Sequence, residues 1–167
     1  MQGEHVEARY VQIVKAKLRS YGDLQRRIDH QVTRLENLMD TIGSLPAASY
    51  SGMPKGSSDG TTKAERYVER KDDLERRIDR MIQEERELRR SVESMIALLT
   101  DPDEQAALEM KYIDGLAWPN VCLSLFGELD DYAEGEDRYM KRTFRIHGEA
   151  LQRLAAHYRD QILASEA

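Results

Sequence analysis

The chain has 167 residues, 34 % of them charged and 7 % aromatic, and a formal net charge of -6. The abundance of charged residues and the scarcity of aromatic ones predict an all-α protein with few strands or none. Its single cysteine, Cys122, excludes an internal disulfide and a cysteine-rich metal site, so we expect a protein of the reducing cytoplasm. No apolar run approaches the ~18 residues that span a bilayer, and the first residues lack a signal-peptide pattern, so we expect no membrane association.

Two segments in the first hundred residues carry apolar side chains at steps of three, four or seven. In the first segment, about 5–42, these are Val14, Leu18, Tyr21, Leu24, Ile28, Leu35, Leu38 and Ile42. In the second they are Tyr67, Leu74, Ile78, Met81, Leu88, Val92, Met95 and Leu99. This spacing places them along one side of a helix, with charged residues on the other sides. The pattern predicts two long helices with a coiled-coil seam.

The stretch 44–62 between these helices is rich in glycine, proline and serine, which interrupts the helix and lets the chain fold back. Thr62 and Glu65 form a capping-box signature at the start of the second helix. Residues 1–100 are therefore expected to form a long antiparallel helical hairpin. A narrow seam leaves apolar surface that favours a partner, so this hairpin is also the expected arm for homo-oligomerisation.

Residues 63–93 carry ten basic and ten acidic side chains, interleaved at helical spacing. Such interleaving is typical of a solvated helix face stabilised by weak pairs. Phosphate contact by the pairs Arg76–Arg77 and Arg89–Arg90 is the alternative interpretation.

Residues 101–167 are expected to form a small helical domain. Asp101 is a helix cap, Pro102 fits the first helical position, and Glu104 stands where a capping box needs it. That helix ends at 114–115, and the residues 116–119 start a second short helix that runs to Gly127. Two short helices joined by a tight turn that contains a glycine are typical of a helix-turn-helix.

Charge is unevenly distributed in this domain. Residues 101–137 hold eleven acidic side chains against one lysine, whereas residues 138–159 hold six basic side chains against one acid. The inward side of the last helix is expected to comprise Phe144 or Thr143, then Ile146, Ala150, Leu151, Leu154, Ala155 and Tyr158. This leaves Arg138, Lys141, Arg142 and Arg145 on the first two turns, where a recognition helix meets the major groove. In the alternative interpretation, these bases pair with the acidic residues of segment 128–137.

Two motifs in this domain resemble a known family. They are MKYIDGLAW at residues 110–118 and RTFRIHGEALQRL at residues 142–154, and a Met-Pro-basic-Gly element at 53–56 accompanies them. Together they resemble phage-encoded regulators of the ArpU/RinA type, including relatives known only as a domain of unknown function. The C-terminal part of that family looks like region four of bacterial sigma factors. The resemblance implies a DNA-binding transcriptional regulator of phage or prophage genes, often late genes, in a bacterial host, with a recognition helix at about 138–158 in the major groove.

The resemblance also assigns roles to single residues. The packing positions that it implies are Tyr112, Leu116, Trp118, Val121, Ile146, Ala150 and Leu151, and the groove-facing ones are Tyr139, Lys141, Arg142 and Arg145. With Arg138 from the charge pattern, the predicted DNA-binding set is Arg138, Tyr139, Lys141, Arg142 and Arg145. Segment 128–137 replaces a tight turn of the shortest family pattern. Its carboxylates repel phosphate unless they point away, or they contact a basic protein partner such as RNA polymerase.

No motif for catalysis, cofactor binding or metal binding is present, so we expect a protein that is not an enzyme and holds no cofactor or metal. Cys122 lies among apolar residues and is expected to be buried. Two alternative functions stay open. One is a DNA-packaging initiation protein of the small-terminase kind, and the other is a polymerase-binding adaptor that does not contact DNA.

Overall fold

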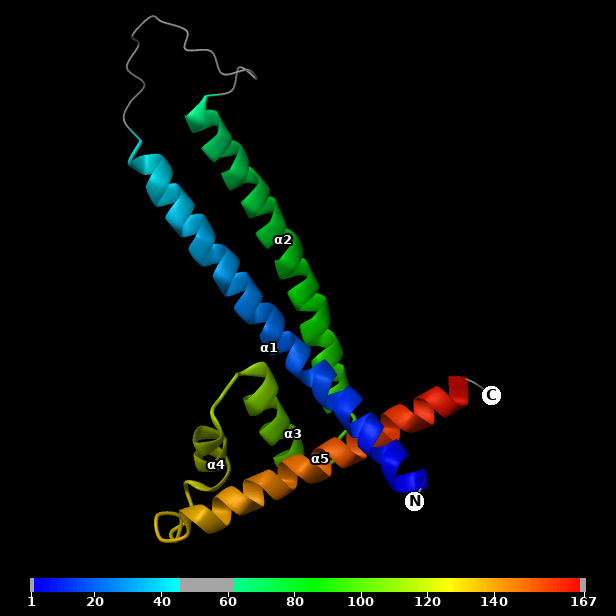
Figure 1. Cartoon of the computed structure of the whole chain (residues 1–167). Helices are drawn as coiled ribbons and strands as arrows, with labels where there is room; N and C mark the ends of the chain where they lie inside the picture. Colours follow the sequence, from blue (N-terminus) through cyan, green and yellow to red (C-terminus); the bar gives the residue numbers. More distant parts are fainter. Residues whose placement is uncertain (1, 46–61, 166–167) are drawn as a thin grey trace, which may run out of the picture. The chain divides into compact units, whose positions relative to one another are not determined.

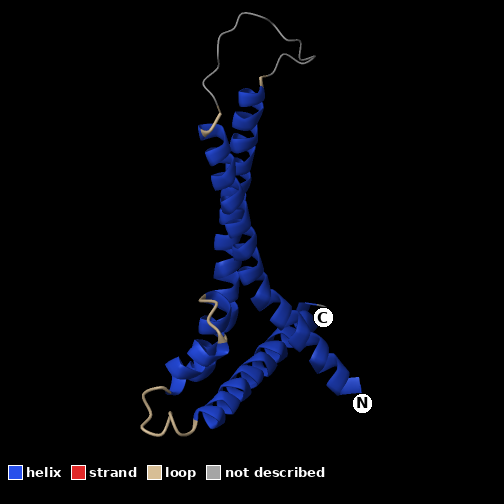
Figure 2. Cartoon of the chain, turned by 60° about the vertical axis from the view of Figure 1, so that its left-hand side comes forward, coloured by secondary structure: helices blue, strands red, loops and turns tan. Residues whose placement is uncertain are grey.

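The computed structural model describes residues 2–45 and 62–165, and within these ranges the chain is helical and has no strand. The elements are α1 (Gln2–Gly43), α2 (Lys63–Ile96), α3 (Pro102–Leu108), the short π-helical turn η1 (Glu109–Ile113), α4 (Trp118–Phe126) and α5 (Glu136–Ser165) (Figure 1). Figure 2 shows the same helices in blue, with the described loops and turns in tan. The predicted all-α class and the long N-terminal helix pair are confirmed. The element at 53–56 and most of the loop predicted at 44–62 lie outside the described residues.

The helix starts follow the predicted caps. The backbone N–H of Thr62 donates to Glu65 Oε2 at 2.6 Å, and the N–H of Glu65 donates to Thr62 Oγ1 at 3.2 Å, which is the reciprocal capping box. At α3, Asp101 Oδ1 accepts hydrogen bonds from the N–H groups of Asp103 and Glu104 at 2.9 and 3.2 Å. Each cap satisfies backbone donors that have no partner within the helix.

Glu104 does not complete a second capping box. Its side chain is 2 % exposed and pairs with Arg153 of α5, 49 positions along the chain. The other carboxylate oxygen, Oε2, is buried and accepts no hydrogen bond from the described residues. The ion pair with α5 therefore replaces the predicted local contact, and it ties α3 to α5.

The chain between α3 and α4 makes a tight turn that depends on a glycine. The backbone N–H of Asp114 donates to the carbonyl of Glu109 at 3.0 Å, five residues back, which is the π-helical spacing of η1. Gly115 follows with a φ of 69°, a left-handed conformation that side-chain-bearing residues rarely adopt. The predicted helix end at 114–115 is confirmed.

The described chain divides into two compact units. The core unit consists of Met1–Asp23 with Arg86–Ala167, and the hairpin unit is Leu24–Glu85. In the hairpin unit, α1 and α2 run side by side in opposite directions (Figure 1). Leu24, Ile78 and Met81 are buried there, whereas Leu38 and Leu74, nearer the connecting loop, are half-buried.

Two hydrophobic clusters form the interior of the core unit. The first contains Val14, Leu18, Tyr21, Val92, Ile96, Leu99, Leu108, Tyr112, Ala150, Leu151, Leu154 and Ala155. The second contains Ala107, Val121, Cys122, Phe126, Tyr139 and Ile146. Residues on both sides of position 100 thus share the first cluster, because the predicted apolar stripes of α1 and α2 continue into it. The domain division at residue 100 stays a prediction.

The predicted packing residues of the C-terminal region are buried or half-buried, and Cys122 is fully buried. Either Phe144 or Thr143 is expected at one inward position of α5, and in the structure Thr143 is the inward residue. Thr143 is 0 % exposed and its hydroxyl donates to the carbonyl of Tyr139, whereas Phe144 is 47 % exposed.

We predict that Arg153→Ala lowers the free energy of unfolding by roughly 2 kcal/mol, because it leaves a buried carboxylate without its partner. Urea denaturation measures this change, and Gln152→Ala, at an exposed neighbouring position, is the control. Adding Glu104→Gln to the Arg153→Ala variant should recover part of the loss, because a neutral amide costs less to bury than a carboxylate. Equal losses in the Arg153 and Gln152 variants would contradict the assigned role of the ion pair.

Candidate nucleic-acid interface

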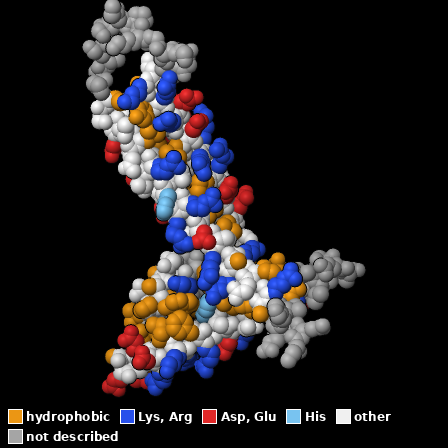
Figure 3. Space-filling model, viewed as in Figure 1, with side chains coloured by type: hydrophobic (Ala, Val, Ile, Leu, Met, Phe, Trp, Pro, Cys, Tyr) orange, Lys and Arg blue, Asp and Glu red, His pale blue; other side chains and the backbone are white. Residues whose placement is uncertain are grey.

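The first turns of α5 keep their basic side chains outside the core unit. Tyr139, Thr143 and Ile146, at steps of four and three, are buried and fix which side of the helix faces inward. Four basic residues, Arg138, Lys141, Arg142 and Arg145, are consequently exposed, and with the edge of Tyr139 they line a shallow hollow of about 530 Å³. Figure 3 shows Lys and Arg side chains gathered along this part of α5.

The structure corrects the placement of Tyr139, which the family resemblance put on the groove-facing side. Its side chain is only 7 % exposed, and its ring stacks on Phe126 and on Tyr132 at centroid distances of 5.1 and 5.7 Å. The burial of Tyr139 is predictable from the sequence, because its spacing from Thr143 and Ile146 continues the buried stripe of α5. Tyr139 therefore packs against Phe126 and Tyr132, and its hydroxyl helps to position Asp131.

Arg138 is held by the acidic segment that precedes α5. Its guanidinium pairs with the Asp131 carboxylate, and the Tyr139 hydroxyl donates to the other oxygen of that carboxylate at 2.6 Å. The hydrogen bond from Tyr139, followed by that from Arg138, lowers the pKa of Asp131 below its ordinary value. Gly135 permits this approach, because a Cβ there would lie 3.0 Å from Arg138 Nη2. Pairing with the acidic segment, the alternative interpretation of the basic cluster, is thus confirmed for Arg138.

The other three bases have different surroundings. The Arg142 guanidinium lies over the Phe126 ring, 4.8 Å from its centroid. Arg145 is 3.9 Å from Glu149, one helical turn along α5. Lys141 makes no ion pair within the described residues. We call Lys141, Arg142 and Arg145 the basic surface of α5, because segment 128–137 neutralises none of them.

The acidic segment itself is anchored by backbone turns. The N–H of Leu129 donates to the carbonyl of Phe126, and the N–H of Tyr132 donates to the carbonyl of Leu129, both at 3.0 Å. With the Tyr132 ring stacked on Tyr139, these bonds fix the segment against α4 and α5. The side chains of Glu128, Asp130 and Glu134 are exposed. A phosphate backbone is repelled by these carboxylates, so an approach that reaches the basic surface must avoid them.

His147, for which the sequence analysis predicts no specific role, lies farther along α5. The Tyr112 hydroxyl is 2.9 Å from His147 Nε2, and the Trp118 ring meets the imidazole edge to face at 4.7 Å. Burial, reinforced by the positive charges of Lys15, Lys111 and Arg19, lowers the pKa of His147 from 6.5 to about 4. His147 is therefore neutral near pH 7, and the imidazole joins α5 to η1 and α4.

This pKa makes the stability of the core unit depend on pH. Between about pH 6.5 and 4, the unfolded chain binds a proton at His147 that the folded chain does not, so the unfolding free energy falls as the pH falls through that window. We predict that the melting temperature drops less from pH 7 to pH 4.5 in His147→Gln than in the wild type.

The exposed His157 lies on the same helix and supplies the matched control. Thermal melts of His157→Gln at both pH values should show the wild-type drop. If His147→Gln also shows the full wild-type drop, His147 does not cause the pH dependence.

Comparison with known proteins gives one partial match. Residues 54–129 match a family described as "Protein of unknown function (DUF1492)". The match runs from before α2 to the start of the acidic segment, so α5 lies beyond it. No curated protein and no solved structure matches the chain.

Two further observations concern the described residues alone. None of their helices is long and apolar enough to cross a bilayer. They also contain no group of three or more His, Cys, Asp or Glu side chains arranged to hold a metal ion.

Proposed function

We propose that the protein is a DNA-binding transcriptional regulator of phage or prophage genes that contacts duplex DNA through the basic surface of α5. One observation carries the proposal. Lys141, Arg142 and Arg145 are exposed on consecutive turns of one helix and are not paired with the acidic segment beside them. A helix of this kind fits the major groove, where arginine and lysine reach both phosphates and guanine edges.

The packing around α5 supports a helix-turn-helix arrangement. α4 and α3 both contact α5, and the second cluster joins Val121 and Phe126 of α4 to Tyr139 and Ile146 of α5. In helix-turn-helix proteins, supporting helices of this kind hold the recognition helix against the duplex. The acidic segment makes the connection between α4 and α5 longer than a tight turn. Its anchoring through Tyr132 and Asp131 gives that connection a defined shape.

The net charge of the whole chain does not oppose this function. Phosphate contact depends on the local field, and the field falls off over about 10 Å at moderate ionic strength. Arg142 is also partly ordered before any contact, because its guanidinium rests on the Phe126 ring. Ordering a long side chain in advance lowers the entropic cost of binding.

The proposed assembly is a homo-oligomer formed through the helical hairpin. A DNA-binding module gains affinity when a second copy engages the same duplex, because the second contact is then intramolecular. The exposed carboxylates of the acidic segment also suit a basic protein partner such as RNA polymerase.

Binding to labelled DNA from the region around its own gene, compared with an unrelated duplex of equal length across a salt series, tests the function. We expect selective binding that weakens as salt rises, because phosphate contacts release counterions. Binding that is absent even at low salt would overturn the proposal and favour the adaptor that contacts only protein.

Two variants test the surface itself. We predict that Arg142→Ala or Arg145→Ala weakens binding by about 1–3 kcal/mol if the side chain contacts a base. For a phosphate contact, we predict a uniform loss across sequences and a salt slope smaller by about one. Arg86→Ala, which removes an exposed positive charge elsewhere in the core unit, is the control. Unchanged affinity in both α5 variants would exclude this surface as the DNA contact.

A further inference from the structure

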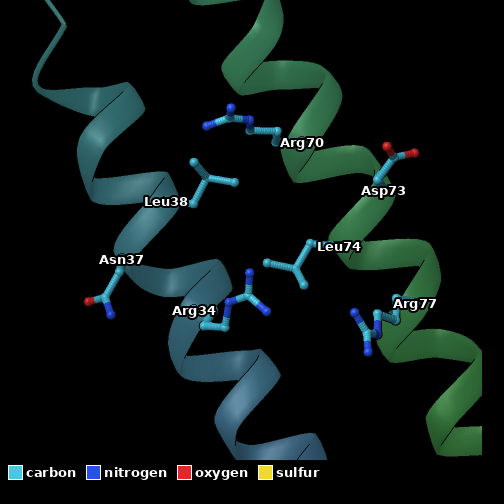
Figure 4. A pocket seen from close by; sticks show the side chains of 7 residues that line it. All are labelled: Arg34, Asn37, Leu38, Arg70, Asp73, Leu74 and Arg77. Atoms are coloured by element: carbon cyan, nitrogen blue, oxygen red, sulfur yellow. The ribbon is translucent and has the colours of Figure 1, made fainter.

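The hairpin unit contains a groove with an apolar floor and a basic rim. It lies between α1 and α2 near the connecting loop and has a volume of about 490 Å³. Leu38 and Leu74 point toward each other across the gap (Figure 4). The guanidinium groups of Arg34, Arg70 and Arg77 point into the same gap (Figure 4). We call these five residues the arginine groove.

None of the three arginines in the groove is paired with a carboxylate of the described chain. Arg34 donates to the neutral Gln31 side chain at 3.2 Å, and Arg70 lies 6.0 Å from the centroid of the Tyr67 ring. Asp73 also borders the groove but points away from it and pairs with Arg76 at 3.3 Å (Figure 4). The groove therefore has three positive charges around two half-buried leucines, and its occupant should be acidic and partly apolar.

The other side of α2 has the complementary character. Four residues at steps of three, one and three lie together on the side of the helix away from Leu74. They are Glu65, Val68, Glu69 and Asp72. Together with Ala64, Asp73 and Arg76 they line a second hollow, of about 480 Å³, and Val68 is 47 % exposed. We call these four residues the acidic face. It presents an exposed aliphatic side chain beside carboxylates. Asp72 lies 4.0 Å from Lys71, and Arg76 at the border of the hollow is paired with Asp73.

We propose that the arginine groove binds the acidic face of α2 from a second copy of the chain. Val68 would pack on Leu38 and Leu74, while the carboxylates of Glu69 and Asp72 would pair with the guanidinium groups at the rim. This is the helix-in-groove mode of recognition, in which the apolar side of one helix fills a groove between two others. A DNA backbone fits the groove less well, because it offers no aliphatic group for the leucine floor.

The position of the two surfaces determines the kind of assembly. Because the arginine groove and the acidic face lie on different sides of α2, one copy uses each surface with a different neighbour. Such a contact is heterologous, and it produces closed rings or open chains. The proposal depends on homo-oligomerisation and is independent of DNA binding.

The test uses two charge-reversal variants of the full chain. The groove variant is Arg70→Glu with Arg77→Glu, and the face variant is Glu69→Arg with Asp72→Arg. Light scattering over a concentration series should show that each variant alone associates roughly tenfold more weakly than the wild type, or more weakly still, because like charges then meet across the contact. An equimolar mixture of the two should regain association, because every contact between unlike copies again joins opposite charges.

The control is Arg86→Glu with Arg90→Glu, which makes the same charge change as the groove variant at exposed positions of the core unit and should leave the mass unchanged. Circular dichroism checks that each variant remains helical, and recovery in the mixture shows that both variants are folded. Masses equal to the wild type in both variants, or a mixture that stays dissociated, would overturn the proposal. The same would follow if the groove variant lost only DNA affinity while its mass stayed that of the wild type, because the groove would then be a nucleic-acid site.

Discussion

The buried stripe of α5 is the constraint on which the rest of the core unit depends. Tyr139 and Ile146 belong to one hydrophobic cluster, and Ala150, Leu151 and Leu154 belong to the other, so one helix joins both. Once this side of α5 is buried, helical geometry leaves Lys141, Arg142 and Arg145 outside. The same packing directs Arg153 to the buried carboxylate of Glu104 and His147 to Tyr112. The basic surface is therefore a consequence of how the core is built.

The features predicted from sequence are those that depend on neighbouring residues. The capping box at Thr62, the cap at Asp101 and the turn at Gly115 involve groups within a few positions, and the structure shows each of them. The two interpretations that failed have different causes. The position of Glu104 three residues after Asp101 predicts a capping role. In the structure its carboxylate instead pairs with Arg153, 49 positions along the chain. Tyr139 was placed by family resemblance, although its spacing from Thr143 and Ile146 puts it on the buried stripe.

In the hairpin unit, the interleaved charges of α2 lie on different sides of the helix and do not form one uniform solvated face. Counted along the sequence, the basic and acidic residues of 63–93 balance. Around the helix they separate in part, because Arg70 and Arg77 border the groove with α1 whereas Glu69 and Asp72 lie on the other side, next to the Asp73–Arg76 pair. This separation depends on which side of α2 faces α1, and net charge alone does not predict it. A neutral segment can thus present two complementary surfaces.

We propose that the exposed side of α5 contacts duplex DNA, and the decisive measurement is lysine acetylation of the unmodified protein. Mass spectrometry would compare the reactivity of each lysine with and without duplex from the region around the gene. We expect Lys141 to lose reactivity in proportion to the DNA added, while Lys63 and Lys71, on α2 of the hairpin unit, keep theirs. Equal reactivity of Lys141 with and without saturating DNA would exclude the exposed side of α5 as the DNA contact.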